Sequence, residues 1–351
     1  MEMTNIQRPG TTVVPTSMQD AWVEVSWRGG VARVAGASSG RLGTRTPGGA
    51  AAGGHGMFAQ WTWDGTTLSA EVDRYGFFSL FYAVDGDTVR LSPSLLALAA
   101  RGAALKPDRR ALGVFHRLGM FINDDTPFKG IKVLPPGGTL TWRDGKLRVD
   151  APKRSFREQQ ISRADAVDGM IELFRQAMAR VLDIWAGPII LPLSGGRDSR
   201  HILLELMRQG RAPDACVTFH HGGANWNTEV KAARAICEAA GVRHEVLGHP
   251  RSRSVDILRT IVLTQLCADE HAQMMPLYDY LLDHQEAAAF DGIAGDILTN
   301  PDDDAALFFQ LARSGDFPAI ARHMIAGHGG IISRGAEGAG AGSAFSPDRD
   351  E

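Results

Sequence analysis

Residues 189–199 read IILPLSGGRDS, an apolar run that leads directly into a turn rich in serine and glycine. The apolar part, 189–193, is typical of a parallel strand that is covered on both faces. Gly195 and Gly196 allow the backbone to approach a ligand closely, and a helix is predicted to begin near Asp198. Free amide groups and the positive dipole end at a helix start bind anions. The stretch therefore predicts a phosphate-binding loop.

The chain after this loop alternates between predicted helices and strands. Helices are predicted over 199–209 and 228–240, where Gly210 and Gly241 end them, and strands over 216–220 and 244–247. This alternation indicates an α/β domain with a doubly wound parallel sheet. Ligands bind such sheets at the carboxyl ends of the strands, which is where the glycine-rich loop is predicted to lie.

A long helix is predicted ahead of this sheet. Ser162 followed by Asp165 resembles a capping box, the typical start of a helix. Apolar residues then recur at helical spacing: Val167, Met170, Ile171, Phe174, Met178, Val181, Leu182 and Trp185.

The N-terminal half has a different pattern. β-prone runs over 58–63, 67–72, 78–84 and 88–91 predict an antiparallel meander, because Asp-Gly turns separate two of the pairs. Residues 29–56 are rich in small residues and are predicted to form loops between short strands. Helices over 94–101 and 108–118 and a hairpin over 139–149 complete an α+β half.

The length of 351 residues favours two domains. We predict a first domain over 1–150 and a second over 162–326, joined by a polar linker with Pro152. Residues 327–351 are rich in glycine and alanine and are expected to be a flexible or truncated end.

Composition excludes several classes of function. A net charge of -3 argues against a nucleic-acid-binding protein, because such proteins neutralise phosphates with lysine and arginine. No apolar stretch is long enough for a membrane span or a secretion signal, and the three cysteines form no CxxC pair. We expect a cytoplasmic protein that acts on small molecules or peptides. A homodimer is one option for its assembly.

The loop at 194–199, SGGRDS, resembles the SGGxDS loop of the ATP-pyrophosphatases, which cleave ATP between the α and β phosphates and adenylate a substrate. The resemblance implies that Ser194, Gly195, Gly196, Asp198 and Ser199 bind ATP, and that Asp198 also helps to hold Mg²⁺. An ordinary tight strand-to-helix turn is the alternative for so short a motif.

Arg197 departs from the small apolar residue usual at its position in these loops, and Arg200 follows it closely. Both are interpreted as solvated charges on a helix surface, and contact of a guanidinium with a phosphate is the alternative.

Two further segments resemble one branch of this superfamily. Residues 73–82, DRYGFFSLFY, resemble the DRxGxxPLYY segment of the asparagine synthetases, and residues 126–138, TPFKGIKVLPPGG, resemble their FxGIxxLPPG segment. With the loop at 194 and the helix start NTE at 227–229 they stand in the order of the asparagine synthetase family, which includes β-lactam synthetase and the lasso-peptide cyclases. The resemblance implies an Ntn-type, glutaminase-like first domain and a second domain of the adenine nucleotide α-hydrolase type.

Residues 292–297, GIAGDI, stand where the family has GxGADE, which supplies carboxylates to magnesium and pyrophosphate. The resemblance implies that Asp296 is a catalytic and metal-binding partner of Asp198, while Ile297 replaces the expected glutamate. Two hard oxygen ligands together with phosphates and water suffice for Mg²⁺.

By position, the resemblance also implies adenine recognition by backbone near the first two strands and the second motif. It points to Leu191, Leu193, Thr218, Phe219 and Gly292. For Leu191 and Leu193, a place in the sheet core explains the sequence equally well.

Asp269, Glu270 and His271 precede the region where the wall of the acceptor pocket would begin in the family. A carboxylate pair beside a histidine can bind an amine or act as a base. A polar helix face is the alternative.

The resulting hypothesis is an ATP- and Mg²⁺-dependent carbon–nitrogen ligase that adenylates a small-molecule or peptide carboxylate, releases pyrophosphate and joins an amine. Glutamine hydrolysis of its own is not expected, because position 2 is Glu2 and no cysteine precedes Cys216. The alternatives are a β-lactam or lasso-peptide type cyclase and an inactive nucleotide-binding homologue. The latter is suggested by Ile297 and by the absence of any lysine after Lys231.

Overall fold

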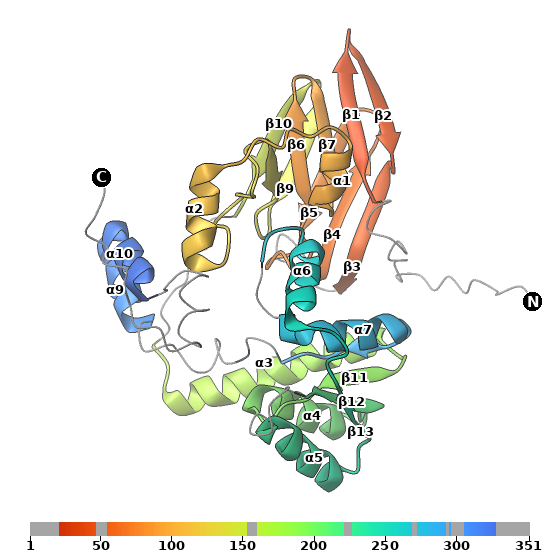
Figure 1. The fold of residues 1–351 in the computed structure, drawn as a ribbon, viewed down its shortest axis with the longest axis vertical. Coiled ribbons are helices and arrows are strands. Elements are labelled where there is room, and N and C mark those ends of the chain that lie inside the picture. Colours follow the sequence, from red (N-terminus) through yellow and green to blue (C-terminus); the bar gives the residue numbers. More distant parts are fainter. Residues whose placement is uncertain are drawn as a thin grey trace, which may run out of the picture. The chain divides into compact units, whose positions relative to one another are not determined.

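A computed structural model describes residues 21–46, 55–152, 160–220, 227–268, 272–292, 295 and 305–327 (Figure 1). The chain forms two compact units. Unit 1 comprises Met1–Ser155, Gln265–Ala268 and Ala321–Glu351, and unit 2 comprises Phe156–Thr264 and Asp269–Ile320. The predicted domain bounds of 1–150 and 162–326, and the nature of residues 327–351, stay predictions.

The described residues of unit 1 include two antiparallel sheets, in agreement with the predicted strand-rich α+β half. The first sheet has the order β2 (Val31–Gly36), β1 (Val23–Arg28), β7 (Thr88–Ser92), β6 (Phe81–Asp85), β8 (Ile131–Val133). The second has the order β10 (Lys146–Asp150), β9 (Thr139–Arg143), β5 (Thr67–Val72), β4 (His55–Trp63), β3 (Ser39–Thr46).

The prediction of a single meander is wrong, because β4 and β5 belong to one sheet and β6 and β7 to the other. The chain changes sheets just after Asp73, whose side chain is fully buried. The Asp73 carboxylate accepts hydrogen bonds from the amides of Phe58, Tyr75, Gly76 and Phe77 at 2.8–3.1 Å. These bonds tie the crossing loop to the start of β4.

Residues 29–56 are predicted to form loops between short strands, and the described part contains β2 and the eight-residue strand β3, which are joined by only two residues. Residues 47–54 lie outside the described residues. The glycines in β3 serve close packing. A Cβ at Gly40 would collide with the ring of Trp61, and one at Gly43, which has φ of 69°, would collide with the carbonyl of Met57. The two glycines therefore let the β3 backbone approach Trp61 and Met57 of the paired strand β4 closely.

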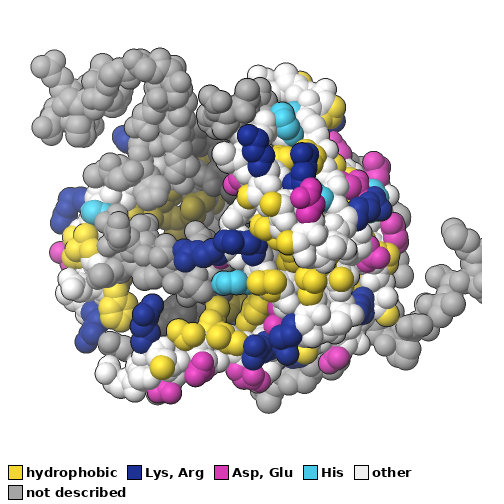
Figure 2. All heavy atoms as spheres, turned by 90° about the horizontal axis from the view of Figure 1, so that it is seen from below, with side chains coloured by type: hydrophobic (Ala, Val, Ile, Leu, Met, Phe, Trp, Pro, Cys, Tyr) yellow, Lys and Arg dark blue, Asp and Glu magenta, His cyan; other side chains and the backbone are white. Residues whose placement is uncertain are grey.

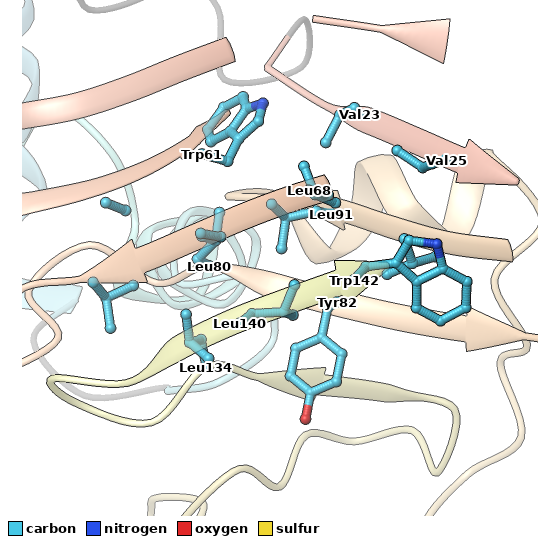
Figure 3. Close-up of a cluster of buried hydrophobic side chains, with 14 of the residues drawn as sticks. Val23, Val25, Trp61, Leu68, Leu80, Tyr82, Leu91, Leu134, Leu140 and Trp142 are labelled. Atoms are coloured by element: carbon cyan, nitrogen blue, oxygen red, sulfur yellow. The ribbon is translucent and has the colours of Figure 1, made fainter. Parts of the chain in front are cut away.

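The core of unit 1 lies between the two sheets. Figure 3 shows large side chains from both sheets in this core, among them Val23 and Leu91 from the first sheet and Trp61, Leu140 and Trp142 from the second. The opposite face of the first sheet packs against the apolar side of α1 (Leu95–Ala100). α2 (Arg109–Leu118) is capped by the Asp108 side chain.

Unit 2 contains the predicted parallel sheet, in the order β13 (His244–Leu247), β12 (Ala215–Phe219), β11 (Ile189–Pro192), β14 (Ala288–Ala289). One face packs against α3 (Arg163–Ile184), α4 (Arg197–Arg208) and α5 (Thr228–Ala240). The other face packs against α7 (Met275–Asp283). Helices thus cover both faces of a parallel sheet, as predicted.

The remaining described helices are short. They are α6 (Arg253–Leu263), η2 (Ala272–Met274), α9 (Ala305–Ser314) and α10 (Phe317–Gly327). No helix in the described ranges is both long and apolar enough to cross a bilayer.

The long helix α3 begins as predicted, since Ser162 Oγ accepts a hydrogen bond from the Asp165 amide at 3.1 Å. Its apolar stripe is only partly used. Met178 is buried against the sheet, whereas Val167, Met170 and Ile171 are exposed. The space-filling view in Figure 2 shows further exposed hydrophobic side chains among Lys and Arg side chains.

The Asp73 loop yields a stability prediction. We expect Asp73→Ala to lower the free energy of unfolding by at least about 1–3 kcal/mol, the cost of one buried donor left without a partner. Urea denaturation measures this. Asp64→Ala is the matched control, because Asp64 accepts amide bonds from Thr66 and Thr67 in an exposed turn. An Asp73 variant no less stable than the Asp64 variant would contradict the stabilising role of the Asp73 hydrogen bonds.

Candidate functional site

The predicted phosphate loop joins β11 to α4. β11 is buried on both faces, and Leu193, the last residue before the loop, donates its amide to the Val217 carbonyl of the neighbouring strand at 2.9 Å. Gly196 is the N-cap of α4 and makes no side-chain capping bond. The first amides of α4 therefore point out of the carboxyl edge of the sheet without a capping side chain, as an anion site requires.

Hydrogen bonds inside the loop hold its shape. The Ser194 amide donates to Ser199 Oγ at 3.2 Å, and the Gly196 amide donates to Ser194 Oγ at 3.1 Å. Arg200 Nε donates to the Gly196 carbonyl at 3.0 Å, so Arg200 braces the loop backbone. Arg197 is exposed, as in the predicted surface role. Both serine hydroxyls are thus engaged within the loop itself.

The start of α5 lies beside the loop. A Cβ at Gly195 would lie 3.1 Å from Ala232 Cβ and 3.7 Å from Glu229 Cα. A side chain at Gly195 would press on α5, which explains the small residue there. The structure therefore brings the NTE helix start to the loop, which the order of the segments alone does not determine.

The second predicted motif also reaches the loop. A Cβ at Gly292 would lie 2.8 Å from the Ser199 amide nitrogen and 3.1 Å from the Asp198 carbonyl carbon. A Cβ at Gly295 would lie 2.9 Å from the carboxyl carbon of Asp198. The backbone at Gly292 and at Gly295 therefore lies directly against the first turn of α4. Asp296 and Ile297 lie outside the described residues.

The Asp198 side chain is half-buried at this contact. Within the described ranges, no hydrogen bond or ion pair engages its carboxylate. A carboxylate at the start of a helix that is predicted to bind phosphate, facing a glycine backbone, has the oxygen chemistry that a hard cation such as Mg²⁺ prefers. No cluster of three metal-ligating side chains occurs among the residues described, so Mg²⁺ here would depend on phosphate oxygens and water as well.

The residues predicted near adenine fall on different faces of the sheet. Leu191 and Leu193 are buried in the core beneath α4 and α5, and the amide and carbonyl of Leu193 are already bonded to Val217 and Thr218. Thr218 is buried, and its hydroxyl bonds to the Leu193 carbonyl. Phe219 packs on the opposite, α7 face, edge-on to His249. Contact of these residues with a nucleotide stays a prediction.

The predicted acceptor residues Asp269, Glu270 and His271 lie outside the described residues. The described helices on either side of them carry an ion-pair network that the sequence did not reveal. It joins Arg251 and Arg259 to Asp256 and Asp279, for example Arg251 Nε to Asp256 Oδ1 at 3.0 Å and Arg259 Nη2 to Asp279 Oδ1 at 2.5 Å, linking α6 to α7.

The sequence does not predict that network, because its two ion pairs to Asp279 join residues 28 and 20 positions apart in the chain. Another residue missed was His244, whose ring contacts Thr218. A hollow of about 530 Å³ lies near His244, and none of its lining residues belongs to the loop at 194–199. It is lined by residues of α5, of β13 and of the turn between them: Arg234, Cys237, Glu238, Gly241, Val242, Arg243, His244 and Val246.

Comparison with known proteins supports the predicted glutaminase-like nature of the N-terminal part. Residues 49–154 match the family model described as a glutamine amidotransferase domain, which is less than half of the chain. No curated protein matches the sequence.

Two solved structures show a weak likeness. One is glutamine phosphoribosylpyrophosphate (PRPP) amidotransferase from B. subtilis complexed with ADP and GMP, at 13% identity and a TM-score of 0.20, over 54% of this chain and 32% of that one. The other is described as the allosteric regulatory enzyme of purine biosynthesis, at 11% identity and a TM-score of 0.20, over 55% of this chain and 32% of that one. This chain spans about a third of the length of either enzyme. The family match shows a domain of the glutamine amidotransferase type over residues 49–154.

The contact between Gly292 and α4 gives a second stability prediction. We expect Gly292→Ala to destabilise unit 2 by about 1–3 kcal/mol, because its methyl group must displace the helix backbone. Gly169→Ala in α3 is the control, since its methyl group meets no atom within 4 Å and removes a helix-destabilising glycine. Equal unfolding midpoints for both variants in chemical denaturation would show that the contact is absent.

A pH prediction comes from Glu205 on α4. Hydrogen bonds from Arg208 lower the pKa of the buried Glu205 carboxyl to about 2, and a bond from Gln209 adds to this while burial opposes it. Because the folded-state pKa lies below the ordinary value of 4.5, the stabilisation is complete above pH 4.5 and is lost as the pH falls toward 2.

We expect Glu205→Gln to lower the thermal midpoint at pH 6. At pH 3 the difference in thermal midpoint between the variant and the wild type should be smaller. Glu172→Gln is the control, since Glu172 is exposed on α3, accepts a bond from Gln176 and acts on Arg208 through its charge. A Glu205→Gln deficit that stays constant with pH would contradict the ionised pairing.

Proposed function

We propose that this chain is an asparagine synthetase-like, ATP-dependent ligase. In this proposal it adenylates a carboxylate, releases pyrophosphate and forms an amide with an amine. The observation that carries it is the loop of residues 194–199, with the SGGxDS pattern, at the carboxyl edge of a parallel sheet and in contact with Gly292 and Gly295. The amidotransferase-type domain at 49–154 supports the same branch of the superfamily.

The loop residues have defined roles in this proposal. The amides at the start of α4 bind the phosphates, and the Asp198 carboxylate, with Asp296, holds Mg²⁺. Magnesium, when bound, would neutralise negative charge on the leaving pyrophosphate. Asp269, Glu270 and His271 would face the acceptor or the amine. The substrate is a small-molecule or peptide carboxylate.

The amidotransferase-type domain is proposed to lack glutaminase activity. An N-terminal-nucleophile glutaminase needs a cysteine thiolate, and the sequence has none before Cys216. The amine would then come from a separate donor, or from the substrate itself, as in a β-lactam or lasso-peptide cyclase. Ammonia release from glutamine would refute this part alone.

The decisive experiment is ATP–pyrophosphate exchange with candidate carboxylates. We expect Asp198→Asn to lower the exchange rate by at least about 100-fold, the usual cost of removing one preorganised electrostatic group. Asp165→Asn, which changes another first-turn aspartate at the exposed start of α3, is the control and should leave exchange unchanged. Formation of ADP and phosphate, or an unaffected Asp198 variant, would overturn the mechanism.

An inactive nucleotide-binding homologue is the second candidate, favoured by Ile297 and by the lack of lysine after Lys231. Calorimetry separates the two functions. Nucleotide binding without AMP release, across the carboxylates tested, would favour the inactive homologue.

A further inference from the structure

The hydroxyl of Thr218 is buried between β11 and β13. Thr218 Oγ1 lies 2.6 Å from the Leu193 carbonyl oxygen and 3.0 Å from His244 Nε2. A carbonyl oxygen only accepts hydrogen bonds, so the single hydroxyl proton points at Leu193. His244 Nε2 must then carry a proton and donate to Thr218. The three groups form a directed chain from His244 to Leu193.

His244 reaches Thr218 because of the strand register. Cys216 pairs with His244 across β12 and β13, so Thr218, two residues along, lies on the same face as His244. That face is covered by α5, whose Arg234 and Glu238 line the same hollow as the His244 ring. Burial and, secondarily, the charge of Arg234 lower the pKa of His244, while Glu238 opposes them. The lowered pKa favours the neutral ring, and the bond to Thr218 places its proton on Nε2.

The chain ends at the peptide that opens the phosphate loop. The Leu193 carbonyl is held by Thr218, and the amide of the same peptide group, on Ser194, is held by Ser199 Oγ at 3.2 Å. A planar peptide group held at both ends cannot rotate. The following amides of the loop therefore keep their direction before any anion arrives.

We propose that His244 and Thr218 are positioning residues for the phosphate loop, acting through the Leu193–Ser194 peptide to preorganise its amides for ATP. This rests on the proposed function. Neither side chain contacts the reacting atoms in this scheme. Thr218, predicted from sequence as a nucleotide contact, acts here from beneath the loop.

The test compares KM and kcat for ATP in pyrophosphate exchange. Thr218→Val keeps the shape and removes the hydroxyl, so KM should rise about fivefold to tenfold while kcat changes by less than about twofold, since one hydrogen bond of ordinary strength is lost. Thr218→Ser should restore most of the affinity. Thr218→Val with an unchanged KM overturns the proposal.

Thr260→Val is the matched control. Thr260 is also buried, and its hydroxyl donates to the Asp256 carbonyl at 2.9 Å, on α6. It should lower the thermal midpoint about as much as Thr218→Val but leave KM unchanged. A similar rise in KM for both variants would reduce the role of Thr218 to general stability and overturn the proposal.

A double-mutant cycle tests the direction of the chain. His244→Phe should raise KM about threefold in the wild type and have no effect in the Thr218→Val background, because His244 acts only through Thr218. Proton NMR should show the His244 proton on Nε2. Additive effects, or a proton on Nδ1 alone, would overturn the relay.

The outcomes separate this proposal from the ligase function. Exchange by the wild type with an unaffected Thr218→Val variant would refute the relay and leave the ligase standing. ATP binding without exchange would refute the ligase, and the same ratios measured as Kd by calorimetry then decide the relay. A wild type that binds no ATP would refute both.

Discussion

The candidate site depends on one close approach, that of the backbone at Gly292 and at Gly295 to the first turn of α4. Added Cβ atoms at these two glycines would lie within 3 Å of Ser199 and Asp198. Only a bare backbone fits there, and among the described residues no side chain bonds to the half-buried Asp198 carboxylate. Charge that is half-buried and unpaired is costly unless a ligand compensates it. This constraint supports the proposal of a cation and phosphates at this end of the sheet.

The loop itself is built to keep its shape without a ligand. Its two serine hydroxyls bond to loop amides, Arg200 braces the Gly196 carbonyl, and Thr218 holds the Leu193 carbonyl from below. Each bond contributes only about 1 kcal/mol, but together they remove the freedom that binding would otherwise have to restrict. Preorganisation of this kind favours tight binding of an anion whose shape matches the fixed loop.

Unit 1 is held together by the core between its two sheets and by a segment from late in the chain. Its two sheets enclose a core dominated by tryptophan and leucine side chains, and the crossing between them is held by Asp73. The segment Gln265–Ala268, from late in the chain, belongs to this unit: Gln265 Oε1 accepts a bond from Ser94 Oγ at 2.9 Å, and Leu266 packs on the α1 side of the first sheet. A well-packed domain of the amidotransferase type is thus maintained in a chain whose sequence offers no cysteine nucleophile before Cys216.

Local patterns in the sequence determined the parallel sheet of unit 2, the helices around it and the strand–loop–helix at 189–199, because apolar periodicity, caps and glycines act over a few residues. The division of the N-terminal strands between two sheets, the regular strand β3 and the exposed start of the α3 stripe depended on tertiary packing, which periodicity does not encode. The same holds for the site. Sequence order named Asp198 and Gly292, but only the folded chain brought them together and placed His244 behind Thr218, since contacts across strands depend on register and not on spacing along the chain.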